Sequence, residues 1–445
     1  MRPIGIDLFA GAGGMSLGFE QAGFDIVAAV EIDPVHCAVH KFNFPHCAVI
    51  PRSVVGLTGN EIRVAAGIGR RRIDVVFGGA PCQGFSMIGQ RAFDDPRNAL
   101  VRDFLRIVSE LDATYFVFEN VKGLTIGRHR QFVDEIVATA NGLGYDVLSP
   151  WRVLDAAHFG VPQHRERLFL YGAKRPKALP SYPGEKTTAA DGRGKVSSTL
   201  PVGPNASEAL SDIPDADLFE ALSKIDEVRP DTWGEPSAYA SELRCLTNDA
   251  WHFGYVRKWD PSLLTSSART EHTDISRRRF AATAGGDTEP VSRFYKLAPN
   301  GVSNTLRAGT DGARGAFTSP RPIHHEHPRC VTVREMARLH GYPDWFRFNE
   351  TKWHGARQIG NSVPPPLARA VAAQVLESMG VTPEQPFETF DLGDTALLRM
   401  NLSQAASYFG VPAIPSKRDR KSGATKRKQA EIEEMSYIEQ QSLYA

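Results

Sequence analysis

Short apolar runs alternate with helical patterns throughout residues 1–172, and this alternation constrains the fold more than any other feature of the chain. Apolar runs bounded by glycine or proline are typical of strands buried on both faces, and helices between them predict a parallel, doubly wound α/β sheet. The expected strands are 4–9, 26–30, 73–77, 115–119, 146–154 and 167–171. The expected helices are 15–22, 34–42, 100–110 and 132–141. We expect the last two strands to form a hairpin that closes one edge of the sheet.

The chain has 445 residues, which is too long for one ordinary core. Its composition divides it into four parts. Residues 1–173 carry the alternating pattern. Residues 174–325 are rich in Pro, Gly, Ser and Thr, with interleaved arginines and aromatics, and predict a smaller, irregular domain. Regular patterns return in residues 326–380, and residues 381–445 form a C-terminal extension.

The last two parts contain three helical patterns. We expect a helix at 332–339 with Thr332 as its N-cap, and another at 366–379. In the extension, 397–409 has a helical pattern, and the basic run 417–428 is typical of a disordered tail.

One loop suggests chemistry. Residues 78–86, Gly-Gly-Ala-Pro-Cys-Gln-Gly-Phe-Ser, follow the predicted strand 73–77 and place Cys82 at its carboxyl end. Open α/β sheets place their active sites at this edge, and a thiol whose pKa is lowered is a strong nucleophile. The alternative is a structural cysteine, because free cysteines are among the most buried residues. The loop alone leaves both interpretations open.

A second loop predicts a cofactor site. The first strand ends in Asp7-Leu8-Phe9-Ala10-Gly11-Ala12-Gly13-Gly14, and a helix follows. Glycines allow a ligand close to the backbone at a helix N-terminus, and Glu31, at the end of the second strand, suits ribose hydroxyls. The spacing fits a dinucleotide, an adenosyl group, or a glycine turn without ligand. Phe9, and a loop without basic residues, favour an adenosyl group that lacks a pyrophosphate.

A carboxylate is expected beside the thiol. Glu119 ends the strand 115–119, which in a doubly wound sheet neighbours the strand before Cys82. A thiolate can add to an electron-poor ring while an acid stabilises charge on a ring nitrogen, and partial burial would raise the pKa of that acid. The alternative is an ion-paired or helix-capping glutamate.

The charge balance, the apolar stretches and the cysteine count make several classes of protein and site less favourable. The 52 Lys and Arg residues balance 51 Asp and Glu, so a nucleic-acid site would need locally concentrated basic residues. No apolar stretch is long enough to span a membrane, and the start of the chain lacks a signal-peptide pattern, which predicts a cytoplasmic protein. Five scattered cysteines predict neither disulfides nor zinc. We expect no metal at His164 or at the cluster His324, His325 and His327.

The chain also contains, in this order, the segments DLFAGAGG, GGAPCQGFS, FENVKGL, VPQHRERLFLYG, VREMARLHGYPD and QIGNSVPPPLARAVA, in residues 4–172 and about 300–375. They resemble the ordered motifs of the DNA (cytosine-5) methyltransferase family of restriction-modification systems. The resemblance implies an enzyme that uses S-adenosyl-L-methionine to methylate carbon 5 of cytosine. It also implies a Rossmann-like catalytic domain at 1–173, a target-recognition domain inserted at 174–325, and a return segment at 326–380 that completes the catalytic domain.

The resemblance assigns roles to single residues. Cys82 would add to carbon 6 of the base, and Glu119 would contact ring nitrogen 3. Gln163, Arg165 and Arg167 match a QxRxR motif. There Arg165 would hold the carbonyl oxygen of the base and the catalytic loop, while Arg167 would be structural.

Further positions match the cofactor site of the family; they are Phe9, Gly11, Gly13, Glu31, Leu100, Asn361 and Ser362. One position departs from the pattern. Ser53 stands where the family usually has an aspartate that binds the adenine amino group, which puts the adenine contact in doubt.

Double-stranded DNA is the expected partner, and the target base must be flipped out of the duplex. Gln90 and Arg91, in the loop after Cys82, could close over the base. The candidate readout residues in the inserted domain are Arg277, Arg279, Arg293 and Arg307. The alternative is that these arginines are solvated or ion-paired on the surface.

We expect the protein to act as a monomer on DNA without an obligate protein partner, and to protect host DNA from a cognate endonuclease. One alternative is an RNA cytosine-5 methyltransferase. Another is a DNA-binding regulator that uses the C-terminal extension, where residues 402–411 weakly resemble the first half of a helix-turn-helix. A nicotinamide dehydrogenase is disfavoured by the cysteine loop and by Phe9.

Overall fold

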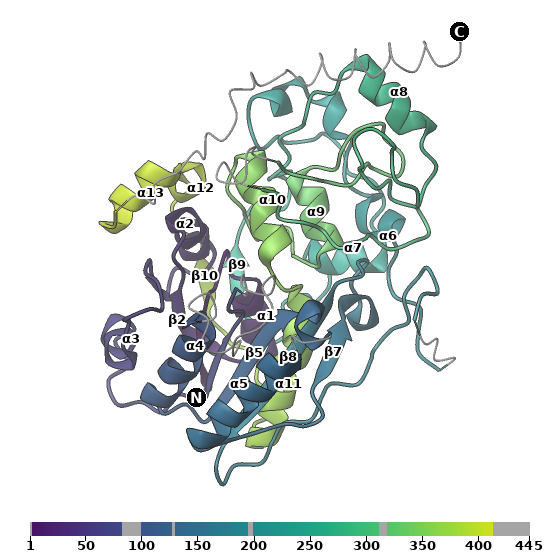
Figure 1. Cartoon of the computed structure of the whole chain (residues 1–445). Helices are drawn as coiled ribbons and strands as arrows, with labels where there is room; N and C mark the ends of the chain where they lie inside the picture. Colours follow the sequence, from purple (N-terminus) through teal and green to yellow (C-terminus); the bar gives the residue numbers. More distant parts are fainter. Residues whose placement is uncertain (1, 82–98, 127–129, 195–198, 311–317, 413–445) are drawn as a thin grey trace, which may run out of the picture.

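The computed structural model describes residues 2–81, 99–126, 130–194, 199–310 and 318–412 (Figure 1). Within these ranges, eight strands form one sheet in the order β3-β2-β1-β4-β5-β8-β6, with β7 also paired to β8. The strands are β1 (Ile4–Leu8), β2 (Asp25–Val30), β3 (Ala48–Ile50), β4 (Val75–Gly78), β5 (Tyr115–Val121), β6 (Tyr145–Val147), β7 (Arg152–Asp155) and β8 (Glu166–Lys174). The first five are parallel, and β8 runs antiparallel to β5. The predicted α/β class is confirmed.

The predicted hairpin is wrong in one respect. Residues 146–154 were expected to form one strand, but they contain two short strands, β6 and β7, on either side of Ser149 and Pro150. Both strands pair with β8. They are separate because proline has no backbone N–H and so interrupts the ladder of hydrogen bonds between them. The three-residue β3 and the helix α3 (Gly59–Ala65) were not predicted from the sequence.

Helices cover both faces of the sheet. The four predicted helices are confirmed as α1 (Gly14–Ala22), α2 (Pro34–Asn43), α4 (Ala99–Glu110) and α5 (Arg130–Gly142). Alternate residues of each strand face opposite cores, as the pleat requires. Val75 and Phe77 of β4 pack with α1, whereas Val76 packs on the other side with Phe104 of α4 and Ile136 of α5.

Residues late in the chain return to this sheet. Helix α11 (Pro365–Met379) lies along α1, and a Cβ on Gly18 of α1 would come within 2.4 Å of the Ala368 Cβ. Glycine at this position therefore permits the close approach of the two helices. By contrast, α9 (Val333–Leu339), with the predicted capping box of Thr332 and Glu335, packs against α6 (Ala206–Leu210) and α10 (Lys352–Asn361).

The region between the two parts of the sheet domain has little regular structure. Besides α6, its elements are α7 (Ala238–Leu243), β9 (Val256–Lys258), α8 (Asp274–Ala282) and the 3-10 turns η6 (Ala216–Leu218) and η7 (Glu220–Ser223). Two further 3-10 turns, η3 (Lys122–Thr125) and η5 (Ala156–Phe159), flank the last strands of the sheet. Figure 1 shows this region above the sheet, with α8 at its far end.

The C-terminal extension packs onto the first domain. Strand β10 (Thr389–Asp391) pairs in parallel with β9. The predicted helical stretch 397–409 is two helices, α12 (Ala396–Arg399) and α13 (Leu402–Phe409), because Asn401 caps the start of the second. Leu397 and Leu398 of α12 lie in a small core with Val39 of α2. Within the described ranges, no helix is long and apolar enough to cross a membrane.

Candidate active site

The segment that leads to Cys82 lies against Glu119. Strands β4 and β5 are adjacent and parallel, as predicted, so their carboxyl ends meet. A Cβ on Gly79 would come within 2.3 Å of a Glu119 carboxylate oxygen, so a larger residue there would force the Glu119 side chain to move. Asn120 donates a hydrogen bond of 2.9 Å from Nδ2 to the Ala80 carbonyl. Cys82 itself lies outside the described residues, as do Gln90 and Arg91.

Glu119 is held by an arginine. Its Oε1 lies 2.8 Å from Nε of Arg167, and each side chain is only 12% exposed. Arg167 stands opposite Val121 in the β5–β8 ladder, so it is the diagonal neighbour of Glu119 on the same face of the sheet. Burial raises the pKa of the Glu119 carboxyl above its usual value, while the charges of Arg167 and Arg165 oppose this rise.

The two arginines make different contacts from those that the resemblance implied. Arg165 was expected to face the base, but its guanidinium is buried and donates to the carbonyls of Leu306, at 3.0 Å, and Gly360, at 2.7 Å. A buried guanidinium needs acceptors for its N–H groups; these carbonyls bind its two terminal nitrogens, while its Nε has no hydrogen-bond partner among the described residues. Arg165 therefore ties the start of β8 to two late segments, whereas Arg167, expected to be structural, contacts Glu119.

The glycine loop at the end of β1 adopts a left-handed backbone at three positions, of which two are glycines. Phe9, Gly11 and Gly13 have positive φ angles of 66°, 55° and 105°. The Glu31 carboxylate accepts the Gly11 N–H at 2.8 Å and the Asp33 N–H at 2.9 Å. A carboxylate has further lone pairs, so Glu31 can still accept hydroxyl groups of a ribose.

The backbone of the glycine loop faces open space at Gly11. Among the described residues, no heavy atom lies within 4 Å of a Cβ built on Gly11. Sequence reasoning did not single out Ile32, a large apolar residue directly after Glu31 that is 55% exposed. Its place next to the acid was the available signal. Ser53 accepts the Val55 N–H at 3.1 Å, and its contact with adenine stays a prediction.

The late cofactor candidates lie at the same loop. Ser362, after α10, packs against Gly14, where a Cβ would come within 2.9 Å of the Ser362 Cβ. Asn361, the last residue of α10, is exposed, while Leu100 of α4 and Phe9 pack against the same core.

Gln163 and Ser362 are joined through a residue that sequence reasoning did not single out. His340 is fully buried and contacts Gln163 Nε2 at 2.8 Å and Ser362 Oγ at 3.0 Å. The available signal was a histidine inside the segment VREMARLHGYPD.

A buried acid at the cofactor loop predicts a pH effect on stability. Burial raises the pKa of Asp7 to about 8, although the Ser16 hydroxyl, 2.6 Å from Oδ2, opposes this shift. The folded state then binds this proton more tightly than the unfolded chain, whose aspartates have a pKa of about 3.9. The stability that the proton contributes is complete below about pH 4 and is lost as the pH rises towards 8.

Asp7→Asn should therefore gain stability over wild type progressively between about pH 4 and pH 8. Urea unfolding at several pH values measures the gain, and Asp112→Asn, at an exposed carboxylate, is the control. A gain that does not change with pH would contradict the prediction.

The four candidate readout arginines fall into two pairs. Arg277 of α8 forms an ion pair with Asp217, and Arg279 lies 3.1 Å from Glu289, so both are engaged within the protein. Arg293 and Arg307 have exposed side chains, and Arg293 has a positive φ angle of 62°. The structure leaves this second pair better placed to contact a ligand.

His164, His324 and His327 have polar partners within the protein, whereas Nδ1 of His325 has no hydrogen-bond partner among the described residues. His164 lies 2.7 Å from Asp155 and 3.2 Å from Asp191, and the Nδ1 atom of His324 accepts the Glu326 N–H at 3.0 Å. Among the described residues, no group of three or more His, Cys, Asp or Glu side chains is arranged to hold a metal ion.

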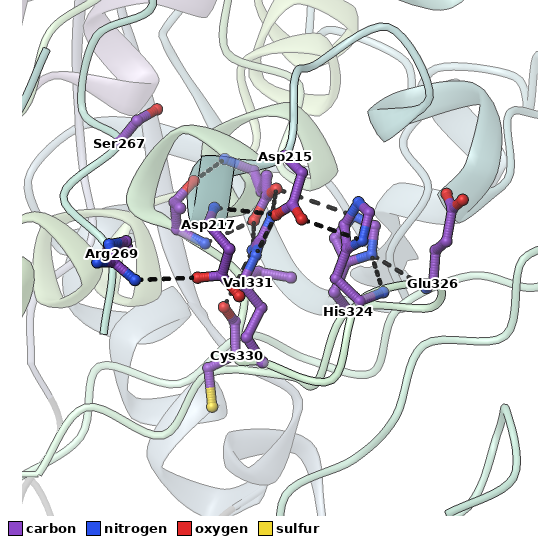
Figure 2. Close-up of polar contacts among 12 residues, drawn as sticks. Asp215, Asp217, Ser267, Arg269, His324, Glu326, Cys330 and Val331 are labelled. Carbon is purple, nitrogen blue, oxygen red and sulfur yellow. Dashed lines mark hydrogen bonds and ion pairs between the residues drawn. The ribbon is translucent and has the colours of Figure 1, made fainter. Parts of the chain in front are cut away.

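His324 borders an ion-pair network that joins the inserted region to α9. Arg329 forms a bidentate pair with Glu335, at 2.8 Å for both contacts, and also contacts Asp215 at 2.9 Å. Figure 2 shows Asp215 and His324 in this network, with Arg269 reaching Asp217 from the other side. Since a buried charge needs a partner, this network ties the start of α9 to the inserted region.

Comparisons with known proteins agree with this geometry. The family model described as C-5 cytosine-specific DNA methylase matches residues 4–377. The chain is 58% identical over 412 residues to the Type II methyltransferase M.XorII of Xanthomonas oryzae pv. oryzae, covering 92% of this chain and 93% of that protein. It is 32% identical to the Type II methyltransferase M1.HphI of Haemophilus parahaemolyticus, covering 84% and 86% of the two chains.

A solved structure is also similar. It is a prophage-encoded E. coli protein described as a DNA modification methyltransferase, with a TM-score of 0.64 and 31% sequence identity. The match covers 85% of this chain and 99% of the E. coli chain.

Proposed function

Because this chain belongs to the family of C-5 cytosine-specific DNA methylases, we propose that it methylates one cytosine within a short sequence of double-stranded DNA through a covalent bond from Cys82. The observation that carries the proposal is the buried pair of Glu119 and Arg167, which lies against the segment leading to Cys82. Burial raises the pKa of the Glu119 carboxyl, which favours its acting as a proton donor to a ring nitrogen.

The proposed reaction starts on the flipped base. The Cys82 thiolate forms a bond from Sγ to carbon 6, and the electrons of the 5,6 double bond move towards carbon 5 and the ring. Glu119 donates a proton to ring nitrogen 3, and Arg167, rather than Arg165, holds the carbonyl oxygen. Carbon 5, now electron-rich, takes the methyl group. Water then removes the proton from carbon 5, the thiolate of Cys82 departs, and the proton on ring nitrogen 3 returns to Glu119, which restores the aromatic ring and the starting state of the acid.

The cofactor residues fit S-adenosyl-L-methionine, which supplies the methyl group when bound. Glu31 would accept the ribose hydroxyls, while Ile32 and Phe9 would cover the flat and apolar parts of the molecule. The open space at Gly11 lets such a ligand reach the backbone. Asn361 and Ser362 would complete the site from the return segment.

On the DNA side, we propose that residues 174–325 read the sequence, residues 326–380 complete the catalytic domain, and Gln90 and Arg91 close over the flipped base. The protein would act as a monomer on the duplex, and its methylation would protect host DNA from a cognate endonuclease. The chain's 58% identity to a Type II methyltransferase supports the protective role.

Conversion-based sequencing of DNA from cells that express the chain tests the proposal. Protected cytosines that share one short sequence would establish the activity, the product and the target together. Uniform conversion would contradict the proposal, and transfer of labelled methyl groups to RNA would then identify an RNA substrate.

The arginine pairs give a prediction about DNA affinity. Arg293→Gln and Arg307→Gln should each weaken DNA binding and lower the slope of log K against log salt by about 1 if the lost contact is to a phosphate. A contact to a base edge should instead cost about 1–3 kcal/mol of sequence discrimination. Fluorescence anisotropy at several salt concentrations, with matched and mismatched duplexes, measures both effects.

Arg277→Gln is the matched control, because its guanidinium is occupied by Asp217. This variant should lose stability more than DNA affinity. If Arg277→Gln weakened DNA binding more than both exposed variants, the division of the arginines would be wrong.

A further inference from the structure

Three side chains from separate segments form a buried chain of hydrogen bonds. Gln163 lies just before β8, His340 follows α9, and Ser362 follows α10. Gln163 Nε2 lies 2.8 Å from His340 Nδ1, and His340 Nε2 lies 3.0 Å from Ser362 Oγ. The chain therefore connects the strand that carries Arg167 with the residue that packs against Gly14 of the glycine loop.

The direction of every hydrogen bond in this chain follows from one backbone group. The Leu306 N–H can only donate, and it donates to Gln163 Oε1 at 3.1 Å. This fixes the amide, so that Gln163 Nε2 donates, both to His340 Nδ1 and to the Leu339 carbonyl at 3.2 Å. His340 Nδ1 is then an acceptor, and the imidazole carries its proton on Nε2.

The serine end of the chain is fixed in the same way. His340 Nε2–H donates to Ser362 Oγ, and the Ser362 hydroxyl donates to the Ile359 carbonyl at 2.9 Å. These two hydrogen bonds fix the direction of the Ser362 O–H bond. Its rotation would leave either the histidine N–H or the Ile359 carbonyl with one hydrogen bond fewer.

The surroundings of His340 favour a neutral ring. It is fully buried, and burial together with the nearby positive charges of Arg165 and Arg167 holds its pKa well below the usual value. A charged ring would also carry a proton on Nδ1, which faces the donor Nε2 of Gln163. Burial and hydrogen bonding therefore select the same protonation state.

We propose that His340 is a positioning residue. Its neutral ring, protonated on Nε2, hydrogen-bonds Ser362 at the cofactor loop and Gln163 at the start of the segment 163–167. It thereby fixes the position of Ser362 relative to that segment, which lies beside Glu119. The assignment of Ser362 to the cofactor site rests on the proposed function. The same segment is fixed a second time by Arg165, which donates to Leu306 and Gly360. His340 and Arg165 thus both hold this segment, and the contact of His340 with Ser362 extends that hold to the cofactor loop.

The protonation state can be measured without any ligand. Nitrogen-15 NMR of histidine-labelled protein distinguishes the two neutral tautomers from the imidazolium, and the His340 signals are those lost in His340→Gln. We expect the Nε2–H tautomer at pH 7. An Nδ1–H tautomer or an imidazolium would overturn the proposal.

The positioning role is tested with S-adenosylhomocysteine, the demethylated form of the cofactor, by calorimetry. His340→Leu removes both ring nitrogens and leaves Gln163 and Ser362 without their partner, so we expect its Kd to rise about ten-fold. His340→Gln again offers an acceptor and a donor, and we expect its Kd to stay within about three-fold of wild type. The cofactor KM should follow the Kd.

His324→Gln is the control, since His324 is another buried histidine and lies in the network of Figure 2 away from the glycine loop. It should leave the Kd unchanged even if the melting temperature falls. An unchanged Kd in His340→Leu, or an equal rise in His340→Leu and His340→Gln, would overturn the positioning role. If wild type failed to bind S-adenosylhomocysteine, the proposed function would be contradicted, while the NMR measurement would still decide the tautomer.

Discussion

Replacing Glu119 with glutamine should lower the rate of methyl transfer by about 10²–10⁴-fold, the range typical of a lost proton donor or acceptor. Glutamine keeps the shape of the side chain but cannot give a proton to a ring nitrogen, and it loses the charge that pairs with Arg167. Single-turnover transfer of a labelled methyl group measures the loss. Glu166→Gln is the matched control, because Glu166 is exposed and pairs only with the exposed Lys122 among the described residues.

The pKa of Glu119 also predicts the direction in which the rate of methyl transfer changes with pH. Burial raises the pKa of Glu119, and the positive charge of Arg167 opposes this rise. If the protonated acid is the active form, the rate falls as the pH rises through the pKa of the folded state. Arg167→Met removes the opposing charge, so its residual activity should persist to a higher pH. A shift of the alkaline limb to lower pH, or full activity of Glu119→Gln, would contradict the proposed proton transfer.

Cys82→Ala should abolish methyl transfer while DNA binding is retained. Without the thiolate no bond forms to carbon 6, and carbon 5 does not become electron-rich enough to take a methyl group. Loss of labelled methyl transfer with unchanged DNA affinity checks this expectation.

A duplex with 5-fluorocytosine at the target gives a second readout, because fluorine cannot leave carbon 5 as a proton does, so the covalent complex persists. Wild type should form such a complex and Cys82→Ala should not. Cys245→Ala is the matched control, because burial raises the pKa of the Cys245 thiol and makes it a poor nucleophile. Residual transfer by Cys82→Ala would contradict the covalent mechanism.

The sequence predicted the sheet because the signals for strands and helices are local. Apolar runs that end at glycine or proline located β1, β2, β4 and β5, and Thr332 with Glu335 located the start of α9. The adjacency of β4 and β5 followed from the doubly wound pattern. Both candidates for chemistry, the cysteine loop and Glu119, follow directly from these strands. The break at Ser149 and Pro150 was missed although Pro150 was a local signal for it; that both short strands pair with β8 is a tertiary property.

What the sequence by itself determined is therefore the α/β class, the motif order and the approach of Glu119 to the cysteine loop, all of which depend on local patterns. The tertiary structure alone decided the partners of charged and polar groups. Arg165 and Arg167 are two residues apart, so an alternating strand pattern places both on the same face of the sheet. Their contacts differ because the β5–β8 register brings Arg167 to Glu119, while carbonyls of residues far along the chain bind Arg165. His340 likewise gains its place from two partners distant in sequence, because buried polar groups are satisfied by whatever the folded chain brings within reach.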